Sequence, residues 1–220
     1  APKIEGQLEI PGYSAYLHPV NDNMLIGIGR QTDGLFWGAT DMFVEEIAVE
    51  GDDTENGGTE IKLPSFPQPI INDASLTHGA KISLFDISDP TSPSEIVTYT
   101  YPNTYTEVEY DFHAFTSVVK NDGSLAFSVP LYTHQYFQSF DQQTNYWQSK
   151  RLYQSSLELF EASNGMMERV GAVQPNYVEY PSSMYNHRSI IDGENVYFID
   201  GDNVWQADWT NPSDAQQIIE

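Results

Sequence analysis

Acidic and imidazole side chains recur at every second position in one short segment of the chain, at Glu107, Glu109, Asp111 and His113. In an extended strand this spacing puts all four on one face. Positions i and i+2 then lie ~6.6 Å apart, so Glu109 and Asp111 could share one Ca²⁺ or Mg²⁺ ion with help from neighbouring loops. The alternative is that the glutamates are solvated and that His113 is hydrogen-bonded inside a sheet.

Three histidines, His18, His113 and His187, each mark the start of a repeated strand pattern. A ring of imidazoles could bind zinc, copper, iron or nickel. Because the three recur in matching places, we instead expect a structural role in buried hydrogen-bond networks. The other two histidines fall in long insertions, where we expect exposed side chains that could form a weak site with a nearby aspartate. These are His78 and His134, with Asp73 and Asp141 as the aspartates.

Aromatic residues are concentrated in a stretch rich in glutamine, serine and asparagine. Aromatic rings supply contact area at low entropic cost, so this stretch could form a platform for a carbohydrate or a peptide. The alternative is that the rings pack over a neighbouring part of the fold or on another subunit. The predicted binding residues are Tyr136, Phe137, Phe140, Tyr146 and Trp147.

Motifs that would identify a catalytic mechanism are absent from the sequence. Neither G-x-S-x-G nor H-E-x-x-H occurs, and no glycine-rich phosphate loop precedes a predicted helix. The segment Asp200 to Asn203 fails as a calcium loop, because Trp205 stands where that loop needs glycine. The chain has no cysteine, which excludes disulfides, thiolate metal sites and cysteine nucleophiles. No catalytic residue is predicted.

The charge of the chain excludes two classes of partner. Nine Lys and Arg against 32 Asp and Glu give a net charge of −23. Nucleic acids and anionic membrane surfaces are bound chiefly through basic side chains, so neither partner is expected. Nor does any apolar run reach the ~20 residues of a spanning helix. A strongly acidic, cysteine-free surface suits a protein in salty external water, and we therefore expect a secreted or extracytoplasmic location.

Short strand-like runs separated by turn residues dominate the chain, and they repeat as three units of four. Such units are typical of β-propeller blades, so the sequence predicts an all-β fold of about three four-stranded antiparallel blades. We also expect one extra N-terminal strand at Ile4–Ile10, a short helical stretch within Leu35–Val49, and two insertions. The blade units are predicted at about 13–102, 108–175 and 184–220, with insertions at 31–80 and 132–155.

Several of these segments resemble a known family. They are GYSAYLHPVNDNMLIGIGR (12–30), ISLFDISDPTSP (82–93), EYDFHAF (109–115), LAFSVPLY (125–132) and the closing stretch 187–209. In this order they are similar to secreted bacterial and archaeal proteins with a C-terminal β-propeller distantly related to WD repeats. The resemblance implies the architecture and an extracytoplasmic location. It implies no mechanism, because no enzymatic motif is established for that family.

Three blades cannot close a propeller, because a closed ring has roughly four to eight. We therefore expect this chain to be part of a larger ring. Upstream sequence could supply the missing blades, or a second copy could do so through a two-fold interface that gives about six blades.

Both insertions leave from the connection between the second and third strands of a blade, so they should project from the same face. Loops on a rigid scaffold often carry binding. We therefore predict a non-catalytic module that recognises a protein or polysaccharide at this face, with Ca²⁺ as a candidate structural ion. The alternatives are a hydrolase or lyase that uses histidines and carboxylates near the channel as acid and base, or a purely structural segment.

Overall fold

The computed structural model describes residues 4–32, 65–73, 78–141, 146–175 and 186–219 of the chain. These residues form fourteen β-strands and two short 3-10 helices. Within this part of the chain, no helix is long and apolar enough to cross a membrane. The prediction of an all-β fold is confirmed.

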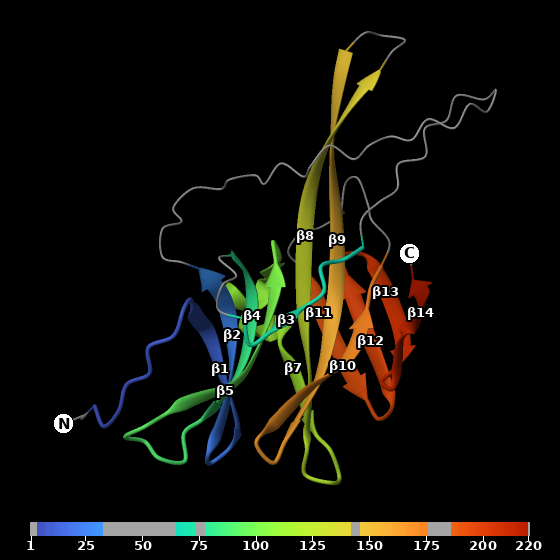
Figure 1. The fold of residues 1–220 in the computed structure, drawn as a ribbon. Helices are drawn as coiled ribbons and strands as arrows, with labels where there is room; N and C mark the ends of the chain where they lie inside the picture. Colours follow the sequence, from blue (N-terminus) through green and yellow to red (C-terminus); the bar gives the residue numbers. More distant parts are fainter. Residues whose placement is uncertain (1–3, 33–64, 74–77, 142–145, 176–185, 220) are drawn as a thin grey trace.

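The strands form three antiparallel sheets, called here blades 1, 2 and 3 in chain order (Figure 1). Blade 1 contains β1 (Tyr13–Asn21), β2 (Met24–Thr32), β4 (His78–Asp86) and β5 (Ser94–Pro102), with β3 (Ile70–Ile71) paired to β5. Blade 2 contains β7 (Thr116–Val119), β8 (Leu125–Asp141), β9 (Tyr146–Ser163) and β10 (Met166–Val173), with β6 (Tyr105–Thr106) paired to β8. Blade 3 contains β11 (His187–Asp192), β12 (Asn195–Asp200), β13 (Asn203–Asp208) and β14 (Asn211–Ile219).

Tight turns connect several pairs of successive strands, as the sequence predicts: β1 to β2, β9 to β10, β11 to β12 and β12 to β13. Between β9 and β10, Asn164 and Gly165 both have positive φ angles, 49° and 79°. Two successive residues with positive φ match the twist of an antiparallel hairpin, and asparagine followed by glycine adopts this conformation at low cost. Apart from the two-residue strands β3 and β6, strands that follow one another in sequence are neighbours in the sheet, so each blade is a meander.

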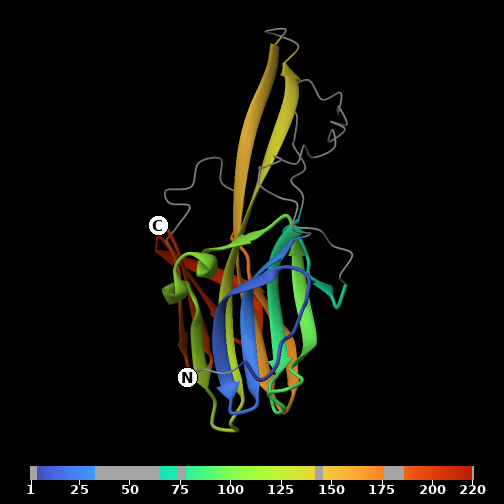
Figure 2. The ribbon, with the colours of Figure 1, turned by 90° about the vertical axis from the view of Figure 1, so that its left-hand side faces the viewer.

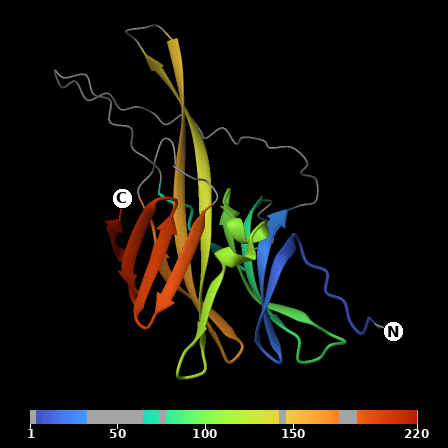
Figure 3. The same cartoon turned by 180° about the vertical axis from the view of Figure 1, so that it is seen from behind.

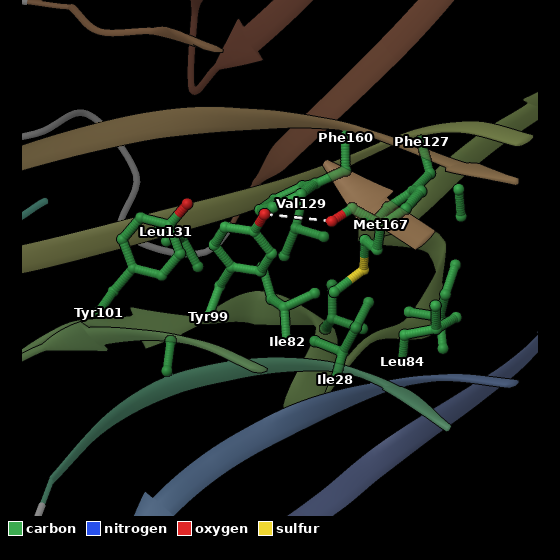
Figure 4. Close-up of a cluster of buried hydrophobic side chains, with 14 of the residues drawn as sticks. Ile28, Ile82, Leu84, Tyr99, Tyr101, Phe127, Val129, Leu131, Phe160 and Met167 are labelled. Carbon is green, nitrogen blue, oxygen red and sulfur yellow. Dashed lines mark hydrogen bonds between the residues drawn. The ribbon is translucent and has the colours of Figure 1, made fainter. Parts of the chain in front are cut away.

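Blade 2 lies between the other two blades and packs against both of them. One face carries Phe127, Val129 and Leu131, which lie in a core with Ile82 and Tyr99 of blade 1 (Figure 4). The opposite face belongs to a second core that blade 3 completes. Side chains alternate between the two faces of a strand, so the long apolar strands of blade 2 supply both cores. The second core contains Leu157, Leu159, Val173, Val196, Phe198 and Trp209.

The predicted N-terminal strand is wrong. Residues 4–10 form no strand, and this segment runs across the outer face of blade 1 (Figure 2). Gly6 packs so closely on the β4–β5 connection that a Cβ there would lie 2.1 Å from the carbonyl oxygen of Pro90. Further along, Lys81 Nζ donates to the carbonyl oxygen of Pro11 at 3.0 Å. Close backbone contacts and a lysine bond therefore hold the segment in place of a strand ladder. The predicted helical stretch at Leu35–Val49 lies outside the described residues.

Both predicted insertions begin and end at the same end of the blades, which we call the upper end. Strand β2 ends and β4 begins there, and β8 and β9 extend beyond blade 2 in the same direction (Figure 1). The second insertion is not the loop that its glutamine-rich composition suggests. Its residues continue β8 and β9 as a two-stranded ribbon, which is paired in unbroken register up to Asp141 and Tyr146. We call residues 133–141 and 146–156 the ribbon.

Candidate functional site

The first strand position of blade 2 is interrupted by a loop. Strands β6 and β7 both pair with β8, and residues 107–115 between them, called here the inner loop, form the 3-10 helices η1 (Glu107–Glu109) and η2 (Phe112–Ala114). Thr106 and Asp111 precede these helices, and their side-chain oxygens accept from the backbone N–H groups of Val108 and His113. Such caps compete with extended backbone. The predicted alternation of residues 107–113 along one strand is therefore wrong.

A buried charge network joins the inner loop to blade 3. His187 Nδ1 lies 3.1 Å from Glu107 Oε2, and His187 Nε2 lies 3.1 Å from Asp200 Oδ1. Burial alone would lower the pKa of His187, but hydrogen bonds and charges from Asp200 and Glu107 outweigh it and raise the pKa to about 9. The imidazole is therefore a cation at neutral pH. Ser155 Oγ donates to the other oxygen of Asp200 at 2.6 Å.

Arg188 extends this network toward the surface. Its guanidinium donates to Glu107 Oε1 at 2.9 Å and also to Asp111. Burial tends to raise the pKa of Glu107, but hydrogen bonds from His187 and Arg188 lower it overall. Hydrogen bonds from the backbone N–H and side chain of His113 also lower the pKa of Asp111. Both carboxylates therefore stay ionised beside their cations.

A second ion pair joins the inner loop to blade 1. Arg30, near the end of β2, donates to Glu109 Oε1 at 3.1 Å, and the Tyr13 hydroxyl donates to Glu109 Oε2 at 3.0 Å. The guanidinium of Arg30 lies over the ring of Tyr105, 4.4 Å from its centre. The inner loop thus contacts blades 1 and 3 through charged side chains, and it lies between them at the centre of Figure 3.

Glu109 and Asp111, the predicted metal ligands, are engaged by different arginines. Glu109 pairs with Arg30, whereas Asp111 pairs with Arg188 and His113. Among the described residues, no group of three His, Cys, Asp or Glu side chains is arranged to hold a metal ion. Calcium binding by this chain stays a prediction.

The three marker histidines do not occupy equivalent positions, contrary to expectation. His18 lies in the middle of β1 and is within hydrogen-bond distance of the Ser117 hydroxyl of blade 2, at 3.3 Å. His187 begins β11 and is buried in the network with Glu107. His113 lies in η2, and its side chain is 69% exposed beside Asp111. His18 and His187 thus contact neighbouring blades, whereas His113 faces solvent.

The predicted aromatic binding residues all fall on the ribbon. Tyr136, Phe137 and Phe140 belong to β8, and Tyr146 and Trp147 belong to β9. Phe140 and Trp147 are register partners near its tip. Tyr146 is 74% exposed. The structure therefore places these five residues on one projecting element.

Sequence reasoning missed a cluster of stacked rings at the base of the ribbon. Tyr105 stacks on Tyr132 with ring centres 5.5 Å apart, and it stacks on His134 at the same distance. His78, at the start of β4, packs edge-on against Tyr105. His78 and His134 are half-buried, contrary to the expected exposure. The spacing of Tyr132 and His134, two positions apart on one strand, is a signal that could have placed both on one face.

The sheets and their contacts define a class of protein. Consecutive four-stranded antiparallel meanders that pack face to face, each starting on the same side, are blades of a β-propeller. The sequence model of a family described as "Beta propeller domain" matches residues 1–211. This chain belongs to that β-propeller domain family.

Two archaeal proteins resemble this chain, and both are described as uncharacterized. One, from Methanocaldococcus jannaschii, is 31% identical over 135 residues, which cover 61% of this chain and 14% of that protein. The other, from Archaeoglobus fulgidus, is 32% identical over 114 residues, which cover 52% of this chain and 11% of that protein. The chain thus spans a small part of the length of these relatives. No solved structure matches it significantly.

Proposed function

We propose that this chain is a non-catalytic recognition module that binds a protein or polysaccharide through the ribbon and the upper end of the blades. The observation that carries the proposal is the ribbon itself. Its two strands stay paired with each other well beyond the residues where β6 and β10 join the sheet. An element that projects from a rigid scaffold and carries many aromatic residues is suited to contact a ligand.

The inner loop supports this function by fixing the scaffold. Its carboxylates pair with arginines or a histidine of blades 1 and 3, so the upper ends of all three blades are linked. The blades from which the ribbon projects are therefore already held in place, and they lose little conformational freedom when a ligand binds to the ribbon.

Alanine substitutions on the ribbon test the proposal. An array of immobilised polysaccharides and a panel of purified cell-surface proteins serve as probes for the wild-type chain. Wherever the wild type binds, the triple variant Tyr136→Ala, Phe140→Ala and Trp147→Ala should lose the signal. The matched control is Tyr110→Ala, which removes an exposed aromatic residue of the inner loop. Equal loss in both variants would contradict a role for the ribbon.

One observation favours the alternative of an enzyme. His113 is exposed, and its Nδ1 lies 2.8 Å from Asp111 Oδ1. A carboxylate that orients an imidazole is an arrangement found in general acid–base catalysis. An enzyme should therefore lose turnover of any substrate in a His113→Ala variant, whereas a recognition module should keep its ligand.

We also propose that another blade packs on the outer face of blade 3, and that the protein acts outside the cytoplasm. The outer face carries apolar residues in alternation with those that face blade 2, and Ile190 and Ile219 are 51% and 54% exposed. In a closed propeller a neighbouring blade covers such a face. The strongly acidic composition supports the proposed location, because salt screens the repulsion between like charges.

A further inference from the structure

We propose that two copies of this chain associate through the free edge of β8 in the ribbon, antiparallel and related by a two-fold axis. The ribbons would then form one four-stranded sheet in the order β9–β8–β8–β9. This inference rests on the proposed function, because it assigns a second copy of the chain as the partner of the same ribbon.

The ribbon offers edges that no described strand covers. Strand β6 pairs with β8 only at Leu131 and Tyr132. On the other side, β10 pairs with β9 only from Leu157 onward. Beyond these points, the part of the chain that the structure describes provides no strand for either edge. An edge strand presents unpaired N–H and C=O groups, which are a template for another strand.

The charge of the ribbon differs from that of the rest of the molecule. Residues 133–141 and 146–156 carry one carboxylate, Asp141, and two cations, Lys150 and Arg151, which give a net charge of +1. Since the whole chain has a charge of −23, the remainder has a charge of −24. Part of that charge lies outside the described residues, and the described residues outside the ribbon hold 20 Asp and Glu and five Lys and Arg, a net charge of −15. The blades of two copies therefore repel each other strongly, whereas their ribbons, at +1 each, repel only weakly.

The length of the ribbon separates the contact from that repulsion. Nine residues of β8 beyond Tyr132 span about 30 Å at ~3.4 Å per residue. The Debye length is only about 8 Å at physiological salt, so the field of the acidic blades is largely screened along the outer ribbon. Two copies can thus meet through their ribbons while their blades stay apart.

The distribution of charge favours the edge of β8 over that of β9. Lys150 and Arg151 lie near the middle of the projecting part of β9, so an antiparallel pair of β9 strands would bring cations opposite each other. Like charges directly opposite each other destabilise a sheet. In a pair of β8 strands centred on Phe137, Asp141 falls opposite Thr133 of the other copy, and no like charges face each other.

Cysteine cross-linking tests the contact, because the natural chain has no cysteine. In the Phe137→Cys variant, the two new thiols would lie opposite each other across the two-fold axis, close enough for a disulfide after small adjustment. If the pair is instead centred on Gln135 or Ser139, the Gln135→Cys or Ser139→Cys variant should cross-link in place of Phe137→Cys. Gln148→Cys, on β9, is the matched control. We expect an oxidised dimer from a β8 variant and none from the control. Equal or preferential cross-linking of the β9 variant would overturn the proposal.

Sedimentation equilibrium tests the same contact without new thiols. A shortened variant joins Gln135 to Leu152, which are register partners, through an Asn-Gly turn and thus removes most of the ribbon. We expect a dimer for the wild type and a monomer for this variant, with an unchanged urea midpoint to show intact blades. Because salt screens the repulsion between blades, association should strengthen between 0.05 M and 0.5 M NaCl.

The matched variants Gln138→Glu and Gln148→Glu add the same charge on β8 and on β9. The β8 change should weaken the dimer about fivefold, and the β9 change by less than about twofold. A wild type that is monomeric at every concentration, or a dimer that survives removal of the ribbon, would overturn this inference. Neither result touches the proposed recognition function, which fails if the triple alanine variant keeps its ligand or if the Tyr110→Ala control loses it equally.

Discussion

Replacing His187 with glutamine should remove the cation that links the inner loop to blade 3. In the folded chain this imidazolium lies between the carboxylates of Glu107 and Asp200, and Glu107 is only 4% exposed. Removal of one member of a buried ion pair typically costs 3–5 kcal/mol, since its partner stays buried without compensation. Arg188 still neutralises part of the charge on Glu107. We therefore expect a loss of about 3 kcal/mol near pH 6.5.

The pH dependence of this loss follows from the pKa of His187. The pKa rises from 6.5 in the unfolded chain to about 9 in the folded one, so the folded state binds the proton more tightly. The resulting stability is complete below pH 6.5 and declines as the pH rises toward 9. At 1.36 kcal/mol per unit, a difference of ~2.5 units corresponds to roughly 3 kcal/mol.

Urea denaturation at pH 6, 7.5 and 9.5, followed by tryptophan fluorescence, measures this effect. The difference in free energy of unfolding between the wild type and His187→Gln should shrink by about 3 kcal/mol from the lowest to the highest pH. The control is His113→Gln at the exposed histidine, which should stay within ~0.5 kcal/mol of the wild type. A wild-type advantage that is constant or grows with pH would show that His187 is uncharged in the folded state.

Three further substitutions test a buried ion pair, the core between blades 2 and 3, and the outer face of blade 3. Arg169→Met should cost about 3–5 kcal/mol in urea denaturation, because it leaves the fully buried Glu158 with only hydroxyl donors such as Tyr101. A loss below 1 kcal/mol would contradict a stabilising ion pair between Arg169 and Glu158. Trp209→Ala should cost about 3–5 kcal/mol by the same assay, since the indole is buried in the core between blades 2 and 3, and an unchanged midpoint would refute that role. Ile190→Glu should leave the free energy of unfolding within ~0.5 kcal/mol but weaken any association through the outer face of blade 3, measured by light scattering; unchanged association would argue against that face.

The strand meanders could be predicted because their signals are local. Apolar residues in short runs, interrupted by pairs such as Asn164 and Gly165, indicate strands and the turns between them. The same strand assignment also predicted that the two insertions lie at one end of the blades, because each insertion follows the second strand of its blade. The resemblance to a propeller family agrees with the matching family model.

The errors occurred where local signals compete. The alternation of Glu107, Glu109 and Asp111 suits a strand, but Thr106 and Asp111 cap 3-10 turns with their own side chains. The glutamine-rich composition of 132–155 suggested a loop. That composition is also compatible with two long paired strands, so it could not distinguish the two structures.

The sequence by itself determined the meander of each blade, the acidic surface and the aromatic, weakly charged composition of the second insertion. These properties depend on residues that are close together in the chain or on their sums. Only the tertiary structure decided which charges meet. Glu107 and His187 lie 80 positions apart, and Arg30 and Glu109 lie 79 apart. Each pair forms because the packing of three sheets brings their upper ends together, and no local pattern encodes the choice among 32 carboxylates.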